Sequence, residues 1–238
     1  MRKALVLARR ELAAMFFSPI AYVIGAMFLL ASGLWFFHAI FIPGQEASLR
    51  PLLEAMAYIM VFAAPLLTMR LLSEELRSGT LETLMTAPVS DAAVVLGKFL
   101  GVLAFYLALL AATGVFLGLM AAYGRPDAGV AATGYLGMVL LGAAFLSVGL
   151  FASSLTPHQL VAALVAMAIL ATFSVLMPAL VASGIEPADR VAARLSVMAY
   201  FGDFARGMLD TRGVVFFLSV SGLFLFLSVK SLESRRWR

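Results

Sequence analysis

Long stretches without a charged residue constrain this chain more than any other feature of its sequence. Residues 58–69 and 99–123 contain no Asp, Glu, Lys or Arg, and a helix of about 20 apolar residues already spans a bilayer core. Strands of a membrane barrel would instead alternate apolar and polar residues. Because backbone groups in lipid must pair with one another, continuous apolar runs are expected to be helices. The sequence predicts an all-α polytopic membrane protein.

Composition and length predict a single transmembrane domain, 1–238, with six spans. The chain is 63% hydrophobic and 13% charged, against about 45–50% and about 25% in soluble domains. Its 238 residues leave room for about six spans of about 20 residues with short loops. The predicted spans are 20–42, 52–72, 92–123, 130–155, 159–183 and 214–229.

Charged residues are expected to lie near the ends of these spans. The third run is too long for one span, so its first turns, with Asp91 and Lys98, are expected in the headgroup region. Ion-driven transporters generally carry ionisable groups or broken helices near the midplane. No such relay is visible here, which favours a protein whose energy comes from a partner.

The distribution of Lys and Arg predicts the orientation. With a cytoplasmic N-terminus, eleven of the 17 Lys and Arg residues lie on the inner side and the other six on the outer side. The inner group is Arg2, Lys3, Arg9, Arg10, Arg70, Arg77, Lys98, Lys230, Arg235, Arg236 and Arg238. Inner loops carry the basic excess in such proteins. We therefore expect both termini in the cytoplasm and the protein in the inner membrane.

The first 18 residues have the pattern of a basic amphipathic helix. On a helical wheel, the basic residues at 2, 3, 9 and 10 share one arc, opposed by Leu5, Leu12, Met15 and Phe16. Such a helix is suited to the inner membrane interface. The alternative is a solvated extension that only supplies charge for orientation.

Residues 70–91 form a polar segment between two apolar runs. Residues 70–77 can continue the second span as a helix, which Gly79 would stop. Thr80 can cap a second short helix, 81–87, and Pro88 would end it. The apolar side of that helix is Leu81, Leu84 and Met85, with Glu82 in its first turn, and Ser90 or Asp91 can cap the third span. The alternative is an ordinary loop whose charges stop membrane insertion.

This polar segment resembles a known family. Glu74-Glu75-x-x-x-Gly79-Thr80-Leu81-Glu82 followed by Pro88-Val89 is similar to the segment typical of ABC-2 type permeases, the membrane subunits of ATP-binding-cassette transporters. Arg10-Glu11 with Ser18-Pro19-Ile20, an expected turn at 151–155, and the stretch 206–212 resemble its gliding-motility-type subfamily.

The resemblance implies roles for three segments. Residues 1–18 would be an elbow helix, and residues 73–90, between spans 2 and 3, would hold the coupling helix that contacts a separate cytoplasmic ATPase. Its ATPase-coupling residues would be Glu74, Glu75, Arg77, Gly79, Thr80, Leu81, Glu82, Leu84, Met85 and Pro88, with Glu74 and Glu75 as charge partners. The expected partners are that ATPase, a second permease copy or paralogue, the lipid bilayer and an auxiliary envelope or periplasmic subunit, but no nucleic acid.

The chain lacks the motifs of an enzyme. No Gly-x-x-x-x-Gly-Lys-Ser/Thr loop is present, so nucleotide would be bound by the partner and no cofactor is expected here. The favoured hypothesis is a non-catalytic permease subunit that couples ATP hydrolysis to transport, and export is the direction that the family resemblance implies. The alternative is a scaffold of an envelope or gliding machinery that transports nothing.

Smaller features give further expectations. The extracytoplasmic segment 184–212 mixes charges and aromatic residues and predicts short interfacial helices, either a gate or a headgroup anchor. Gly114 and Gly118 predict close helix contact within the chain, with a dimer seam as the alternative. Pro65 and Pro178 predict kinks in spans 2 and 5.

Overall fold

The computed structural model describes residues 2–40, 48–79, 90–123, 127–184, 186 and 188–235. These residues form helices and short connections, with no strand among them. In chain order the helices are α1 (Arg2–Phe16), α2 (Pro19–Ile40), α3 (Arg50–Thr68), α4 (Ser73–Ser78), α6 (Asp91–Ala112), α7 (Gly114–Tyr123), α8 (Ala128–Leu155), α9 (Gln159–Ala171), the π-helical η1 (Thr172–Leu176), α10 (Met177–Ser183), α11 (Ala188–Leu195), α12 (Val197–Ala205) and α13 (Thr211–Arg235).

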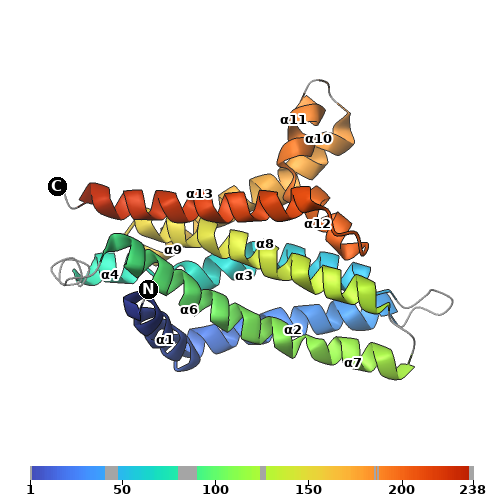
Figure 1. Cartoon of the computed structure of the whole chain (residues 1–238), viewed down its shortest axis with the longest axis horizontal. Helices are drawn as coiled ribbons and strands as arrows, with labels where there is room; N and C mark the ends of the chain where they lie inside the picture. Colours follow the sequence, from blue (N-terminus) through green and yellow to red (C-terminus); the bar gives the residue numbers. More distant parts are fainter. Residues whose placement is uncertain are drawn as a thin grey trace.

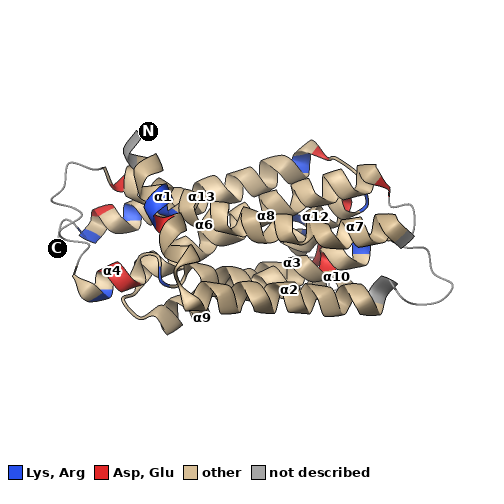
Figure 2. Ribbon diagram, turned by 90° about the horizontal axis from the view of Figure 1, so that it is seen from below, with Lys and Arg blue, Asp and Glu red and all other residues tan. Residues whose placement is uncertain are grey.

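Six stretches of the described chain are long and apolar enough to span a membrane, which confirms the predicted number. They are Pro19–His38, Arg50–Ser78, Asp91–Ala122, Ala128–Leu155, Gln159–Ser183 and Thr211–Arg235. They run along the long axis of the molecule, except for the last part of the fifth, which turns away from it (Figure 1). Helices α1 and α4 and both chain ends lie at the same end of the bundle. Charged residues gather towards the two ends, and the middle of the bundle is free of them (Figure 2).

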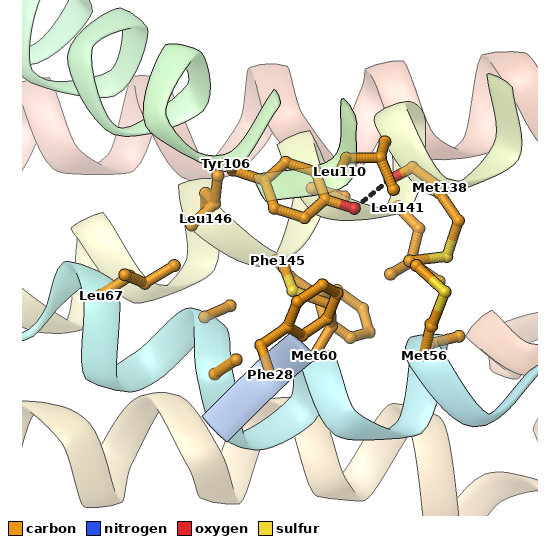
Figure 3. Packing of buried hydrophobic residues seen from close by; sticks show 14 of the residues in the cluster. Phe28, Met56, Met60, Leu67, Tyr106, Leu110, Met138, Leu141, Phe145 and Leu146 are labelled. Atoms are coloured by element: carbon orange, nitrogen blue, oxygen red, sulfur yellow. Dashed lines mark hydrogen bonds between the residues drawn. The ribbon is translucent and has the colours of Figure 1, made fainter. Parts of the chain in front are cut away.

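Helix α8 is the centre of the bundle. It is the most buried of the six spans and packs against α3, α6, α9, α12 and α13. Gly142 has no side chain, so the Tyr106 ring of α6 can lie against the α8 backbone, where a Cβ on Gly142 would be 2.1 Å from it. The Tyr106 hydroxyl then donates to the Met138 carbonyl at 2.8 Å (Figure 3). This bond satisfies a buried polar group deep in an apolar core.

The predicted kink in span 5 coincides with a break in its helix type. Pro178 follows the π-helical turn η1 and has no N–H to donate to the carbonyl of Ser174. Beyond this turn α10 and α11 project away from the other helices (Figure 1). Pro65 lies inside α3, and the kink predicted there stays a prediction.

The expected short helices of segment 184–212 are α11 and α12. The side chains of Phe201 and Phe204 on α12 are buried, and Phe204 lies against Gly137 of α8. Helix α12 is therefore packed onto the bundle, whereas α11 exposes Val191. The contact predicted for Gly114 and Gly118 is wrong, because no other part of the described chain comes within 4 Å of a Cβ placed at either glycine.

Candidate functional site

The second span is interrupted where it reaches the charged end of the bundle. Helix α3 ends at Thr68, residues 69–72 form a turn, and α4 begins at Ser73. The helix predicted to continue the span over residues 70–77 is present from Ser73 to Ser78, but the turn at 69–72 that precedes it was not predicted. The turn frees backbone groups that an uninterrupted helix would pair, so they need other partners.

Ser153 of α8 supplies those partners. Its hydroxyl accepts from the backbone N–H groups of Leu72 and Ser73, both at 3.0 Å, and donates to the Met69 carbonyl at 3.0 Å. One turn earlier, Gly149 leaves room for Thr68. Residues 151–155 are thus the last turn of α8 and not the predicted turn between helices. Through Ser153 the α3–α4 junction is attached to α8.

Replacing Ser153 with alanine should lower the unfolding free energy by about 1–2 kcal/mol, because two buried N–H groups lose their acceptor. Ser154→Ala is the matched control, since the Ser154 hydroxyl donates only to Phe151 of its own helix. Denaturation midpoints in detergent would show the difference. Equal midpoints for the two variants would contradict the attachment.

Helix α4 carries two of the predicted acidic residues in its first turn. Glu74 is exposed and pairs with Arg70 (3.1 Å), while Arg77 is exposed in the last turn. Gly79 adopts the left-handed conformation (φ 70°), which confirms the predicted helix stop. Ser90 caps α6 by accepting from the Ala93 N–H at 3.3 Å, as predicted.

The rest of the predicted coupling set lies outside the described residues. These are Thr80, Leu81, Glu82, Leu84, Met85 and Pro88.

The second acidic residue of α4, Glu75, points into the protein towards Lys98. The Lys98 ammonium lies 2.8 Å from Glu75 Oε1 and 3.0 Å from Glu11 Oε1, and only 3% of the Lys98 side chain is exposed. Lys98 is therefore buried within the protein, and its predicted place at headgroup depth stays a prediction. One lysine of α6 joins a carboxylate from α1 to a carboxylate from α4, and we call Glu11, Glu75 and Lys98 the Lys98 junction.

Two glycines of α6 allow α1 to come close enough for this contact. A Cβ on Gly97 would lie 2.6 Å from the Leu7 Cβ, and one on Gly101 would lie 2.6 Å from the Glu11 Cβ and 3.0 Å from the Ala8 carbonyl. Lys98 lies next to the first glycine, so its ammonium meets Glu11 as the helices cross. The Gly97-x-x-x-Gly101 spacing is a general signal for close helix packing that our predictions did not include, and it does not identify the partner helix.

The packed face of α1 only partly matches the predicted apolar arc. Met15 is buried and Leu12 packs against the core, but Leu5 is 61% exposed and Phe16 is 42% exposed. Ala4 and Ala8 instead face α6, because small residues are needed where the backbones approach. The helix thus contacts the bundle through small residues as well as Leu12 and Met15, and it leaves Leu5 and Phe16 partly exposed.

The Lys98 junction holds two carboxylates, with side chains 18% and 23% exposed, against one buried ammonium. Buried ions are tolerated only when they are paired and hydrogen-bonded. One acceptor, Glu75 Oε2, is buried and makes no hydrogen bond. Within the described ranges, no group of three or more His, Asp or Glu side chains is arranged to hold a metal ion.

Six apolar helices with charges at both ends define a multi-pass membrane protein. The family described as ABC-2 family transporter protein matches residues 9–201, and the chain belongs to that family. The matched region includes all three residues of the Lys98 junction. A search of curated proteins found no match. The family is that of a membrane transport component that works with an ATP-binding partner, and membership of the gliding-motility subfamily stays a prediction.

Proposed function

We propose that the chain is the permease subunit of an exporter in the cytoplasmic membrane, driven by a separate ATPase that docks on residues 73–90. The observation that carries this proposal is the placement of α4. Its exposed Glu74 and Arg77 lie at the end of the bundle where both termini lie, while Glu75 on the same helix is bound to Lys98. One side of α4 can meet a partner while the other is tied to the spans.

The contacts of α4 give a route by which a displacement of this helix is transmitted to α1, α6 and α8. Lys98 links α4 to α6 and α1 through the two ion pairs, and Ser153 links the α3–α4 turn to α8. A displaced α4 would move these helices with it, because breaking a buried ion pair or leaving buried N–H groups unpaired is costly. In this proposal α1 is the elbow helix, and a second copy or a paralogue completes the transport pathway.

The orientation in this proposal follows from the basic residues. Both termini and α4 lie at one end of the bundle. Among the described residues, that end holds the larger share of Lys and Arg, as cytoplasmic ends do. The scaffold hypothesis gains no support from the family match, which is to transporter proteins.

Charge reversal on the exposed side of α4 tests the docking. The double variant Glu74→Lys with Arg77→Glu leaves Glu75 and the Lys98 junction intact. It should lower recovery of the ATP-binding subunit with the tagged chain, and permease-stimulated ATP hydrolysis, by about tenfold or more, because charged pairs at interfaces control association.

The matched control is the charge exchange Lys230→Glu with Glu233→Lys. This exposed pair (2.7 Å) lies on α13 at the same end of the molecule. Its exchange should leave ATPase recovery unchanged. Full recovery and stimulation with the α4 variant, at an unchanged unfolding midpoint, would show that α4 is not the docking site.

A further inference from the structure

A pocket of about 260 Å³ lies beside the Lys98 junction, lined by residues of α1, α2, α3, the α3–α4 turn, α4 and α6. One part of its wall is charged and consists of Glu11, Arg70, Glu74, Glu75 and Lys98. The other part is apolar and includes Ile24, Leu66 and Leu67. A site with both parts suits a ligand that is itself polar at one end and apolar at the other.

The pocket lies where the apolar spans meet the charged end. Helix α2 begins at Pro19, and the second span leaves α3 at Thr68, so the pocket lies at the start of one span and the end of another. Phe17 is 87% exposed and Tyr22 is 57% exposed near the α1–α2 corner. Tyrosines gather at the level of lipid headgroups. The pocket therefore opens at the depth of a phospholipid headgroup.

The charges of the pocket favour a cationic group. Glu11, Glu74 and Glu75 face only Arg70 and Lys98, so the wall has one more carboxylate than cations. Arg70 is paired with Glu74, and Lys98 is shared by the other two carboxylates. The buried Glu75 Oε2 has no donor. A buried carboxylate oxygen is costly without one, so the site fits a ligand that brings a charged N–H.

We propose that this pocket binds a phospholipid with a primary-ammonium headgroup, of the phosphatidylethanolamine type. The Glu75 carboxylate, whose Oε2 is buried in this structure, turns towards the pocket to accept from the ammonium. Arg70 suits the phosphate, and an acyl chain follows the apolar wall at Ile24 and Leu66. A choline headgroup has no N–H to donate, and an anionic headgroup meets an excess of carboxylates. A basic protein surface favours anionic lipids. This pocket favours a headgroup with an ammonium instead, although the whole chain carries a net charge of +4.

Lipid titration of the purified full chain by native mass spectrometry tests this assignment. With matched acyl chains, phosphatidylethanolamine should bind about tenfold more tightly than phosphatidylcholine or phosphatidylglycerol, as one charge-assisted hydrogen bond predicts. Equal binding of the ethanolamine and choline lipids, or a preference for the glycerol lipid, would overturn the proposal. This ranking needs no variant.

The variant Glu75→Gln tests whether the Glu75 carboxylate is the acceptor for the headgroup ammonium. Its amide oxygen can still accept from Lys98, but an NH₂ group takes the place of Oε2 and repels an ammonium. The ethanolamine preference should fall to about twofold or less. Glu233→Gln, a lysine-paired carboxylate on α13, should keep the full preference. An unchanged preference in Glu75→Gln would remove the site from this pocket.

A competition arm separates a bound lipid from a bound soluble amine. Soluble phosphoethanolamine at the lipid's concentration should not displace it, because it lacks the acyl chain that contacts the apolar wall. Displacement would show that the pocket takes a free headgroup and would overturn the lipid assignment.

Discussion

Replacing Lys98 with methionine is expected to lower the unfolding free energy by about 3–5 kcal/mol, since Glu11 and Glu75 would lose the buried cation that they share. The lysine is 3% exposed and makes both ion pairs of the junction. Thermal unfolding in detergent measures the loss. Because the lysine joins α1, α4 and α6, we also expect proteolysis to reach α1 earlier than in the wild type.

Two further variants test whether the loss of stability is specific to the Lys98 junction or follows from removing any lysine. Lys230→Met removes an exposed pair on α13, with side chains 55% and 41% exposed, and should cost less than about 1 kcal/mol. The triple variant Glu11→Gln, Glu75→Gln and Lys98→Met removes all three charges and should recover much of the stability, because uncharged groups of similar size tolerate burial better. An unfolding midpoint unchanged by Lys98→Met would mean that the junction does not hold the helices together.

Replacing Gly101 with leucine is expected to push α1 away from α6 at a cost of about 3 kcal/mol, the upper end for over-packing. A Cβ there would lie 2.6 Å from the Glu11 Cβ and 3.0 Å from the Ala8 carbonyl, and a backbone carbonyl cannot rotate away. Moving Glu11 would also remove one of the two carboxylates from Lys98. The loss therefore combines a steric and an electrostatic effect.

A cysteine reporter shows whether α1 has moved. The natural chain has no cysteine, so Ala4→Cys introduces a single thiol at a position that is 8% exposed. Maleimide labelling of this thiol should be at least about tenfold faster in the Gly101→Leu background, since the site opens when α1 leaves α6. Gly118→Leu is the control, because nothing lies within 4 Å of a Cβ there, and it should leave labelling slow. Equal rates in the two backgrounds would contradict the close crossing.

The Lys98 junction also determines which acidic residues can be mutated to test docking of the ATPase. The sequence suggests Glu74 and Glu75 as equivalent charges for a partner. In the structure Glu74 is exposed, whereas Glu75 is bound to Lys98. Reversing Glu75 would place two cations side by side in the protein, and any loss of ATPase binding would then follow from damage to the junction. Glu74 and Arg77 avoid this ambiguity.

Local signals in the sequence were enough for the helix ends around this site. Gly79 stops α4 because only glycine readily takes a positive φ, and Ser90 starts α6 because its hydroxyl pairs with a free N–H. Both effects act within three residues, so neighbouring residues suffice to predict them. The break at 69–72 was missed, because its hydrogen bonds come from Ser153, about 80 residues away in the chain.

By itself, the sequence determined the class of protein and its six spans. A bilayer core requires long apolar helices, so the number of spans can be counted from the hydropathy of the sequence. It also pointed to the family through the residues around Glu74 and Gly79. Only the tertiary structure decided which charges are buried together. Lys98 lies 87 residues from Glu11 in the chain, and their pairing depends on how closely two glycines let α1 approach α6, a distance that no local pattern contains.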